Sequence, residues 1–595
     1  MYLKRYFSNE RSNSMKAFKR MLKYTYKYRY KYLLGLVFLL VVDIIQLIPP
    51  KIIGFLTDSI SKGTATPNLL LKYIGYIILI AVVASFSRFV WRVLIFGTSR
   101  RVEYDMRSKL FRHLQKMSLN FYNKTKTGDL MALATNDLNA VRMALGPGII
   151  MITDSLVLTI TTLSVMFSVN VKLTLLCIIP LPFIALLAIK FGSKIQKRFT
   201  KVQEAFSKLT DMIQENFSGI RVVKSFVQEE KEYEKFMKEN QNNFDQNMKL
   251  VKIWGLMFPL VELIASLSYV ILVGIGGTFV VYGNISLGDF MSFNIYLGNL
   301  IWPMMAIGWV VNLLQRGAAS LGRIEEVLYH DVEIYDKNTD ENATLNGDIL
   351  INNLTFSYPN SKVPAISNIN LKLKKGQTLG IIGRTGSGKS TLVNLLLHLY
   401  NVEDGKIFIN GYDINRIPLK TLREGIGFVP QEAFLFSTTV AENINLPQDD
   451  FDMEKIISSA KESDIYDNIM DFKDGFETVV GERGVTLSGG QKQRISIART
   501  LIKDPDILIF DDCLSAVDAK TEAEILHNLK ELMKDKTSII ISHRISAIRD
   551  SDIIIVLDNG KIVESGIHKD LIDKKGFYYD IYEKQLIEEK LQEEV

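Results

Sequence analysis

Six apolar segments, each near the ~20 residues that a helix needs to cross a bilayer, fill the first half of this 595-residue chain. A chain of this length is too long for a single hydrophobic core. The sequence therefore predicts a membrane-embedded bundle of six α-helices. We place the segments at 32–56, 71–97, 146–168, 171–192, 251–282 and 288–312.

The connections between these segments alternate in length. Those at 57–70, 168–172 and 283–287 are short, whereas 98–145 and 193–250 are long, helical in pattern and rich in Lys and Arg. The long connections lack Gly/Pro boundaries, so we expect continuous helices rather than soluble inserts. The positive-inside rule then places the long connections in the cytoplasm.

The N-terminal segment, 1–31, is strongly basic and runs directly into the first apolar segment. This position favours contact with anionic lipid over binding of nucleic acid. The apolar segment is too long for a signal-peptide core, and no cleavage pattern follows it. We expect both ends of the chain in the cytoplasm and the protein in the cell membrane.

Two segments within the long connections interrupt the helical pattern. Residues 121–129 are polar and turn-prone, so we expect a helix break and a short crosswise helix that docks on a partner domain. Residues 218–226 are a second candidate region near the moving parts of the membrane domain. With these extensions, the predicted membrane domain spans 32–315.

The character of the sequence changes after Gln315. Residues 316–346 are predicted as a linker, and 583–595 as a charged tail. Between them, β-branched strands alternate with helices, which predicts an α/β nucleotide-binding domain at 347–582. The mean hydropathy of +0.12 fits a membrane part joined to a soluble part. Strands are expected at 349–356, 377–382, 506–511, 536–542 and 553–558.

A phosphate-binding loop follows the second of these strands. Its residues fit G-x-x-x-x-G-K-[ST], in which glycines let backbone N–H groups wrap phosphate oxygens and the next helix adds its dipole. Lys389 is expected to reach the β- and γ-phosphates and Ser390 to bind Mg²⁺. The loop comprises Gly383, Arg384, Thr385, Gly386, Ser387, Gly388, Lys389, Ser390 and Thr391.

Two further motifs belong with this loop. A buried strand ends at Asp511, where a carboxylate holds Mg²⁺ through water. A Ser-Gly-Gly turn precedes the basic helix 492–501 and forms a second phosphate-facing helix N-terminus. One ATP does not need two cradles, so we expect this turn to face the nucleotide of another domain. Its residues are Leu487, Ser488, Gly489, Gly490 and Gln491.

These motifs resemble those of ATP-binding-cassette (ABC) transporters, specifically half-size exporters with fused membrane and nucleotide domains. The resemblance covers essentially the whole chain, through LSGGQ most specifically and through FYNKTKTGDLM and SGIRVVKSF more loosely. It implies ATP and Mg²⁺ as cofactors. It also implies roles for Tyr358 (adenine stacking), Gln431 (Mg²⁺ sensing), Glu482 (exporter-specific loop), Ser515–Asp518 (dimer-interface loop) and His543 (γ-phosphate switch).

One position departs from the family pattern. The residue after the Mg²⁺ aspartate is usually Glu, which polarises the attacking water, but here it is Asp512. A side chain shorter by one methylene misplaces the carboxylate by about 1 Å, which can cost roughly 100-fold in rate. We expect this chain's own site to bind ATP but hydrolyse it poorly. The expected partner is a nonidentical half-transporter with a catalytic Glu and a deviating signature.

Three acids, Asp43, Asp154 and Glu262, lie within apolar segments. Ionisable groups are costly in lipid and normally face a cavity, so these are candidate substrate-cavity residues. Glu262, which follows Pro259, is the leading candidate; pairing with a cation or a place near the membrane edge are alternatives for the other two.

The sequence thus predicts ATP-driven export of amphipathic, drug- or lipid-like small molecules. A lipid or peptide flippase on the same scaffold is the alternative, and an ATP-gated channel or regulator is a third class. The two cysteines, Cys177 and Cys513, offer neither a disulfide framework nor metal-ligand spacing.

Overall fold

The computed structural model describes residues 20–359, 361–481, 487–513, 527 and 530–593, with only the backbone described beyond residue 587. The chain divides into two compact units. Unit 1 comprises Met1–Gln115 and Thr127–His330, and unit 2 comprises Lys116–Lys126 and Asp331–Val595.

The described part of unit 1 is helical from residue 20 onward, with short breaks. Its elements are η1 (Tyr26–Tyr28), α2 (Arg29–Ile45), α3 (Ile48–Ser61), α4 (Pro67–Leu114), α6 (Thr127–Ala132), η2 (Leu133–Asp137), α7 (Leu138–Met143), η3 (Ala144–Gly148), α8 (Ile149–Val169), α9 (Val171–Ile178), α10 (Leu181–Ser218), α11 (Ile220–Ser225), α12 (Glu229–Ile271), η4 (Leu272–Gly276), α13 (Gly277–Val281), α14 (Leu287–Asn299) and α15 (Ile301–Leu328).

These elements join into six helical runs, in the described residues, that are long and apolar enough to cross a membrane. Each run overlaps one predicted segment, so the six-helix membrane bundle is confirmed. The runs are Arg20–Ser61, Pro67–Leu114, Thr127–Val169, Val171–Ser218, Glu229–Val281 and Leu287–Leu328. The long connections are helical extensions of these runs, as expected.

The helices begin where side chains can cap them. Thr66 accepts a hydrogen bond from the Leu69 N–H at the start of α4, where Pro67 occupies the first helical position. Asn170 accepts one from the Leu173 N–H at the start of α9. Such caps satisfy backbone donors that the first turn leaves free, and they fix the short turns between neighbouring helices.

Close contact between α3 and α14 depends on two glycines. A Cβ atom added to Gly288 would lie 2.0 Å from the Gly54 carbonyl oxygen. The Gly288 N–H donates to Asp58 Oδ1 at 2.7 Å. Tyr296 is fully buried, and its hydroxyl donates to the Leu47 carbonyl at 2.6 Å. Any side chain at either glycine would push these helices apart.

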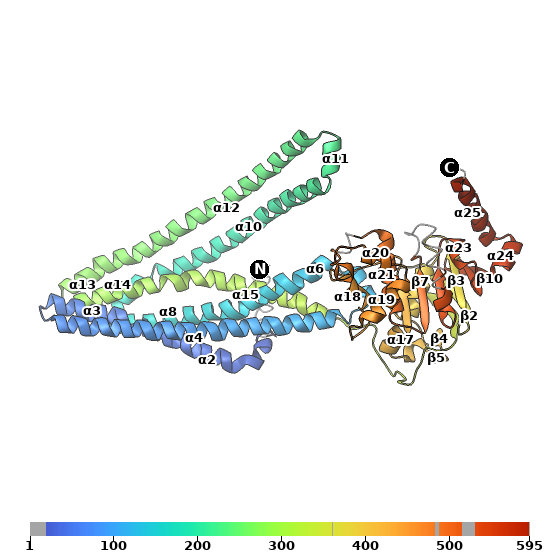
Figure 1. Ribbon diagram of the computed structural model, residues 1–595. Coiled ribbons are helices and arrows are strands. Elements are labelled where there is room, and N and C mark those ends of the chain that lie inside the picture. Colours follow the sequence, from blue (N-terminus) through green and yellow to red (C-terminus); the bar gives the residue numbers. More distant parts are fainter. Residues whose placement is uncertain (1–19, 360, 482–486, 514–526, 528–529, 594–595) are drawn as a thin grey trace. The chain divides into compact units, whose positions relative to one another are not determined.

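Helices α10 and α12 form a pair that separates from α4 and α15 toward α11 (Figure 1). Large apolar side chains near this end are exposed, notably Phe217, Val222 and Phe226. This part of unit 1 therefore leaves apolar surface uncovered within a single chain.

Helix α15 continues to Leu328, beyond the predicted linker start at 316. The segment is polar, but buried charges are paired: Glu325 with Arg20 at 2.7 Å, and Asp137 with Arg323. Ser320 also donates to Asp137 at 2.8 Å. The irregular connection begins at Tyr329, after the helix has ended.

Within 121–129, where a helix break is predicted, Thr125 and Lys126 are the non-helical residues, and a larger break at 115–118 precedes the segment. Helix α4 ends at Leu114, and a short helix, α5 (Leu119–Lys124), belongs to unit 2. Within that unit, Ser118 and Asn120 donate to the same carboxylate oxygen of Glu333, at 2.6 and 3.0 Å.

Unit 2 contains two sheets. The four-stranded sheet has the order β2-β1-β4-β5 and is antiparallel; the six-stranded sheet has the order β10-β9-β3-β8-β7-β6 and is parallel except for β10. The strands are β1 (Ile349–Phe356), β2 (Ile366–Leu373), β3 (Thr378–Gly383), β4 (Ile407–Ile409), β5 (Tyr412–Asp413), β6 (Ile426–Val429), β7 (Ile507–Asp511), β8 (Thr537–Ile541), β9 (Ile553–Asp558) and β10 (Lys561–Gly566). The five predicted strands are all present.

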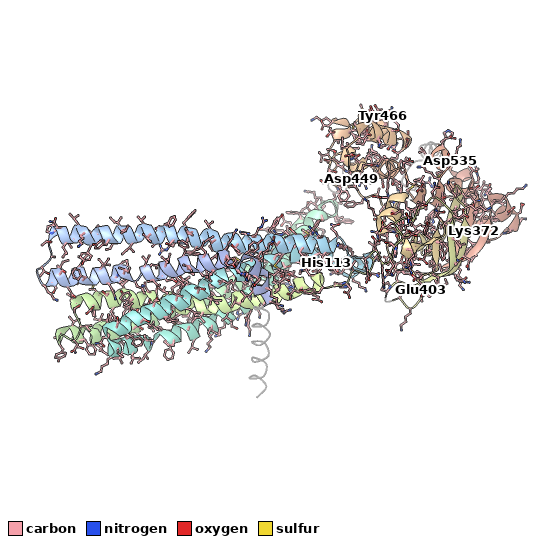
Figure 2. The ribbon with its side chains drawn as sticks, turned by 90° about the horizontal axis from the view of Figure 1, so that it is seen from below. His113, Lys372, Glu403, Asp449, Tyr466 and Asp535 are labelled. Carbon is pink, nitrogen blue, oxygen red and sulfur yellow. The ribbon has the colours of Figure 1, made fainter. Side chains whose placement is uncertain are left out.

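Helices surround these sheets, and the helix bearing Tyr466 and the loop bearing Asp449 lie to one side of the strand that carries Lys372 (Figure 2). The central strands β7 and β8 are fully buried. Parallel strands buried on both faces need continuous apolar sequence, which both have. The helices are α16 (Lys389–Leu396), η5 (Ile414–Arg416), α17 (Leu419–Gly425), α18 (Val440–Ile444), α19 (Met453–Glu462), α20 (Tyr466–Met470), η6 (Gly475–Glu477), α21 (Gly489–Leu501), α23 (Ile545–Ile548), α24 (His568–Lys574) and α25 (Phe577–Glu593).

Helix α25 runs without interruption from Phe577 to Glu593, across the predicted start of the charged tail at 583. Gln585, expected in a charged tail, hydrogen-bonds to the backbone beside α23. The high charge of this segment concealed its helical continuity.

Candidate functional site

The loop between β3 and α16 requires glycine. Gly386 and Gly388 have φ angles of +81° and +101°, which residues with a Cβ rarely adopt. A Cβ atom on Gly388 would also lie 2.7 Å from the Ala365 carbonyl oxygen. The predicted phosphate-binding loop therefore has the strand, glycine turn and helix that its sequence requires.

Lys389 is buried at the start of α16. Its Nζ donates to the carbonyl oxygens of Gly383 and Arg384 at 2.9 and 3.0 Å. Burial lowers the pKa of Lys389, and the charges of Asp511 and Asp512 act in the opposite direction. A buried cation of this kind is suited to an anionic ligand.

A second feature of the loop also fits an anion. The hydroxyl of Ser387 is buried and has no hydrogen-bond partner in the described structure. Arg384, Thr385 and Ser390 are exposed around it. An orphaned hydroxyl beside glycine-turned backbone provides donors for phosphate oxygens.

The loop opens on a cavity of about 330 Å³. This cavity gathers residues that lie far apart in sequence, and it includes every predicted residue for nucleotide, metal and hydrolysis apart from Gly383, Arg384 and Ser387. The predicted residues lining it are Tyr358, Thr385, Gly386, Gly388, Lys389, Ser390, Thr391, Gln431, Asp511, Asp512 and His543.

Asp511 lies at the buried end of β7 and accepts a hydrogen bond from Ser390. Burial raises its pKa, the Ser390 hydrogen bond opposes that shift, and the neighbouring Asp512 charge adds to it. The oxygens of Ser390, Gln431 and Asp511 are the hard donors that Mg²⁺ prefers. Among the described residues no cluster of three His, Cys, Asp or Glu side chains forms a metal cage, so the donors fit a Mg²⁺ ion held jointly with nucleotide phosphates.

Asp512 has an unusual backbone conformation, with φ at +46°. Its N–H donates to the Ile541 carbonyl at 2.8 Å, and its Oδ1 accepts from the His543 N–H at 3.4 Å. The left-handed conformation is uncommon outside glycine, and Asn and Asp adopt it more readily than most other residues. It turns the Asp512 carboxylate toward the backbone of His543.

Three tyrosine-centred contacts connect the cavity to α5. The Tyr358 hydroxyl hydrogen-bonds with Thr391 Oγ1 at 3.0 Å, and its ring meets that of Tyr400 edge-on at 5.2 Å. Asn123 of α5 donates to the Tyr400 hydroxyl at 3.1 Å. Asn123 lies in the predicted docking segment 121–129, but no motif singled out Asn123 itself or Tyr400.

The Ser-Gly-Gly turn is built as expected for a helix N-terminus. Ser488 Oγ accepts from the Gln491 N–H at 3.2 Å, and Gln491 Oε1 accepts from the Ser488 N–H at 2.9 Å, which forms a capping box at the start of α21. None of the described residues lining the cavity comes from Leu487–Gln491. The predicted residues Glu482 and Ser515–Asp518 lie outside the described part of the chain.

Two of the three membrane acids come together. Asp43 of α2 is buried, with one carboxylate oxygen lacking a hydrogen-bond partner among described residues. It faces Asp154 of α8, and Arg88 of α4 is the nearby cation. Glu262 on α12 is exposed and does not join this pair. A search for basic residues inside the apolar segments would have found Arg88.

Comparisons with known proteins cover both units. Residues 32–304 match the family model described as "ABC transporter transmembrane region", and residues 366–515 match the model described as "ABC transporter".

Similar proteins match along nearly their whole length. A probable multidrug resistance ABC transporter ATP-binding/permease protein, YheI of Bacillus subtilis, is 42% identical over 93% of this chain and 94% of its own. The multidrug resistance-like ATP-binding protein MdlA of Escherichia coli is 37% identical over 97% of this chain and 98% of its own. An ATP-dependent lipid A-core flippase of Syntrophus aciditrophicus is 33% identical over 100% and 98%.

A solved structure also shares the fold. It is described as a bacterial Atm1-family ABC exporter with ATP bound, and it is 25% identical to this chain. The TM-score is 0.77, over 94% of this chain and 99% of that one.

Proposed function

This chain belongs to the ABC transporter family as an exporter with fused membrane and ATP-binding domains, and from that premise we propose its substrate class, its pairing and the role of each site residue. It is a multi-pass membrane protein that couples ATP to export. The observation that carries the proposal is one cavity in which the phosphate loop, Gln431, both aspartates and His543 meet.

The proposed substrates are amphipathic small molecules, drug- or lipid-like. The names of the relatives support this class, because two denote multidrug resistance proteins and one a lipid A-core flippase. The acids in the membrane helices, Asp43, Asp154 and Glu262, favour cationic members of the class. The second candidate is lipid flipping, which the flippase relative supports.

In the nucleotide site, Tyr358 stacks on adenine and Lys389 contacts the β- and γ-phosphates. Ser390, Asp511 and Gln431 hold Mg²⁺, which neutralises charge that develops on the transferred phosphoryl group. Asp512 orients the attacking water, and His543 contacts the γ-phosphate. The residues that supply these groups line one cavity, which supports their assignment to one site.

Asp512 makes this site a weak one in the proposal. The carboxylate is one methylene shorter than the usual glutamate, and it already accepts a hydrogen bond from the His543 backbone. A catalytic base that lies about 1 Å too far from the attacking water lowers the rate on the order of 100-fold.

The proposed partner is a second, nonidentical half-transporter with a glutamate at the matching position and a deviating signature. The capped Ser488 turn supports pairing, because it forms a phosphate-type helix N-terminus away from this chain's own cavity. The exposed apolar residues Phe217, Val222 and Phe226 also need a covering surface.

Location follows from the same proposal. We assign the protein to the cell membrane, with both termini in the cytoplasm. The nucleotide site must reach cytoplasmic ATP, and the positive-inside rule places the basic extensions of the helices on the same side. The proposed domains are the basic segment 1–31, the membrane domain from residue 32 through α15, the irregular connection 329–346 and the nucleotide domain from 347 through α25.

The test is transport by the full chain, alone and with a candidate partner, in inverted membrane vesicles. Uptake of a cationic fluorescent dye should require ATP and both chains, and neutralising the partner's glutamate should abolish it. ATP-independent flux would indicate a channel. Movement of labelled lipid without dye uptake would select the flippase alternative.

A further inference from the structure

The C-terminal helix α25 contacts the nucleotide site through one side chain, Gln585. Gln585 Nε2 donates to the His543 carbonyl at 2.6 Å, and Gln585 Oε1 accepts from the Ile545 N–H at 2.9 Å. One amide therefore holds two backbone groups that flank Arg544. A primary amide can donate from its nitrogen and accept at its oxygen at the same time.

The backbone of His543 is held from its other side by the cavity itself. Its N–H donates to Asp512 Oδ1 at 3.4 Å. The preceding residue, Ser542, donates its N–H to the Ile381 carbonyl at 3.2 Å and accepts from the Arg544 N–H at 2.9 Å. Gln585 thus contacts the side of this turn that faces α25.

Helix α25 is anchored firmly enough to serve as a support. The Glu564 carboxylate accepts from the first two backbone N–H groups of the helix, Phe577 at 2.5 Å and Tyr578 at 3.0 Å. Tyr578 is fully buried, and its hydroxyl hydrogen-bonds with His568 Nδ1 at 2.8 Å. A carboxylate at a helix N-terminus is stabilised by both the free N–H groups and the helix dipole.

The start of the same helix touches the phosphate loop. The Arg384 guanidinium lies 5.0 Å from the centre of the Phe577 ring. Residues 577 and 585 are eight positions apart, so about 12 Å of helix joins the two contacts. Helix α25 therefore connects the loop that binds phosphate with the turn that carries His543.

We propose that Gln585 is a positioning residue for His543. Through it, α25 fixes the position of the turn that carries His543 relative to the phosphate loop. This inference rests on the proposed role of His543 at the γ-phosphate. Gln585 touches no nucleotide in this scheme. It acts only by holding the His543 carbonyl and the Ile545 N–H.

The experiment uses the full chain in lipid nanodiscs. Hydrogen–deuterium exchange of a peptide covering 543–549 reports the Ile545 N–H directly. Gln585→Ala should speed that exchange by roughly a factor of ten, since a lost hydrogen bond of ordinary strength corresponds to about that change. Glu583→Ala is the matched control, because Glu583 is exposed on the same helix.

A third variant separates the two hydrogen bonds. The carboxylate in Gln585→Glu still accepts from the Ile545 N–H but no longer donates to the His543 carbonyl. Hydrogen exchange at the Ile545 N–H should stay slow, while the His543 carbonyl loses its hydrogen bond to residue 585.

Turnover is measured in a chain that also carries Asp512→Glu, so that its own site is active. In this background both Gln585→Ala and Gln585→Glu should lower kcat roughly ten- to a hundredfold, with KM for ATP and nucleotide affinity unchanged. Unchanged exchange and kcat for Gln585→Ala would overturn the proposal. Faster exchange with unchanged kcat would limit Gln585 to a structural role, which also overturns it.

Failure of the proposed function has a different signature. His543→Ala in the same background should abolish turnover. If His543→Ala retains full turnover, or the Asp512→Glu chain does not turn over ATP at all, the assigned site roles are wrong. The exchange measurement then still decides whether Gln585 holds the turn.

Discussion

Asn123 of α5 donates a hydrogen bond of 3.1 Å to the hydroxyl of Tyr400, whose ring packs edge-on against Tyr358 in the nucleotide cavity. The side chain of Tyr400 therefore links α5 to Tyr358, the residue proposed to stack on adenine. This relationship makes the α5 contact testable apart from the hydrolytic chemistry.

Tyr400→Phe should remove the hydrogen bond to Asn123 and keep the ring in place, a loss of about 0.5–1.5 kcal/mol. We expect basal ATP hydrolysis and nucleotide affinity to stay near wild type, while stimulation by transport substrate falls. The measurement is ATPase activity with and without a substrate dye in nanodiscs. Asn123→Ala should reduce the substrate stimulation of ATPase activity as much as Tyr400→Phe does. Different reductions in the two variants would show that α5 is not responsible for the loss of stimulation.

Lys389→Ala should weaken nucleotide binding without unfolding the nucleotide domain. The side chain carries the buried positive charge of the phosphate loop, and its removal leaves the Gly383 and Arg384 carbonyls accessible to water. Binding of a fluorescent ATP analogue to the full chain should drop by tenfold or more, since charge-assisted hydrogen bonds are worth about 1.5–3 kcal/mol. Unchanged affinity would mean that this loop does not bind phosphate.

Asp512→Glu should raise ATP turnover of the purified chain by roughly ten- to a hundredfold, because the longer side chain restores about 1 Å of reach. Asp512→Asn should leave the low activity of the native chain almost unchanged, and in the paired transporter it should leave substantial turnover. Steady-state phosphate release provides the comparison. Rapid turnover of the native chain alone, abolished by Asp512→Asn, would instead make Asp512 a competent base and remove the argument for a nonidentical partner.

The partner's site gives the converse prediction. Ser488 caps α21 and, in the proposal, completes the nucleotide site of the second chain. Ser488→Ala should cost about 1 kcal/mol of local helix stability through the lost cap and should nearly abolish turnover of the paired transporter. Turnover that survives Ser488→Ala but not a change in the partner's own signature would reverse the assignment of the two sites.

Acid should loosen the anchor of α25 through His568. Burial lowers the pKa of His568 below its ordinary 6.5; the charge of Arg549 lowers it further and that of Asp550 opposes it. A lowered pKa means that the folded state binds the proton less well than the unfolded state. The stabilising contribution is therefore present above about pH 6.5 and is lost as pH falls through the lower folded value.

The measurement is thermal unfolding of the full chain followed between pH 5 and pH 8. The difference in melting temperature between native chain and His568→Gln should shrink as the pH falls. A difference that is independent of pH would show that His568 supports Tyr578 only by packing.

The fold was largely predictable because it depends on strong local patterns, and most residues predicted for the nucleotide site line one cavity. The apolar segments had to become membrane helices, and the glycines of 383–391 had to form a turn between β3 and α16. The cavity then followed from topology, since β3, β7 and β8 are neighbours and their ends meet.

What the sequence did not disclose are contacts whose residues carry no motif. Gln585 lies in a highly charged segment that could not be told from a tail, yet its amide finds two backbone groups near His543. The charged end of α15 looked like a linker because its ion pairs with Arg20 and Asp137 join positions far apart in the chain. Tertiary pairing of charges leaves no periodic signal in one sequence.

The acids in the membrane helices are a second case in which the sequence alone did not predict which residues meet. Asp43 and Asp154 face each other across α2 and α8, whereas Glu262 is exposed. If Glu262 faces a cavity shared with a second chain, Glu262→Gln should reduce transport of cationic dyes more than neutral ones. Equal effects on both dye classes would leave Glu262 as a structural residue.

The length of α4 has a mechanical consequence. Its 48 residues form one unbroken helix, about 72 Å long at 1.5 Å per residue, more than twice the ~30 Å of hydrocarbon that it must cross. At this length, a tilt of about 5° about one end moves the other end by roughly 6 Å. A small rotation of α4 therefore displaces its far end by about the rise of one helical turn, without any bond in the helix being broken.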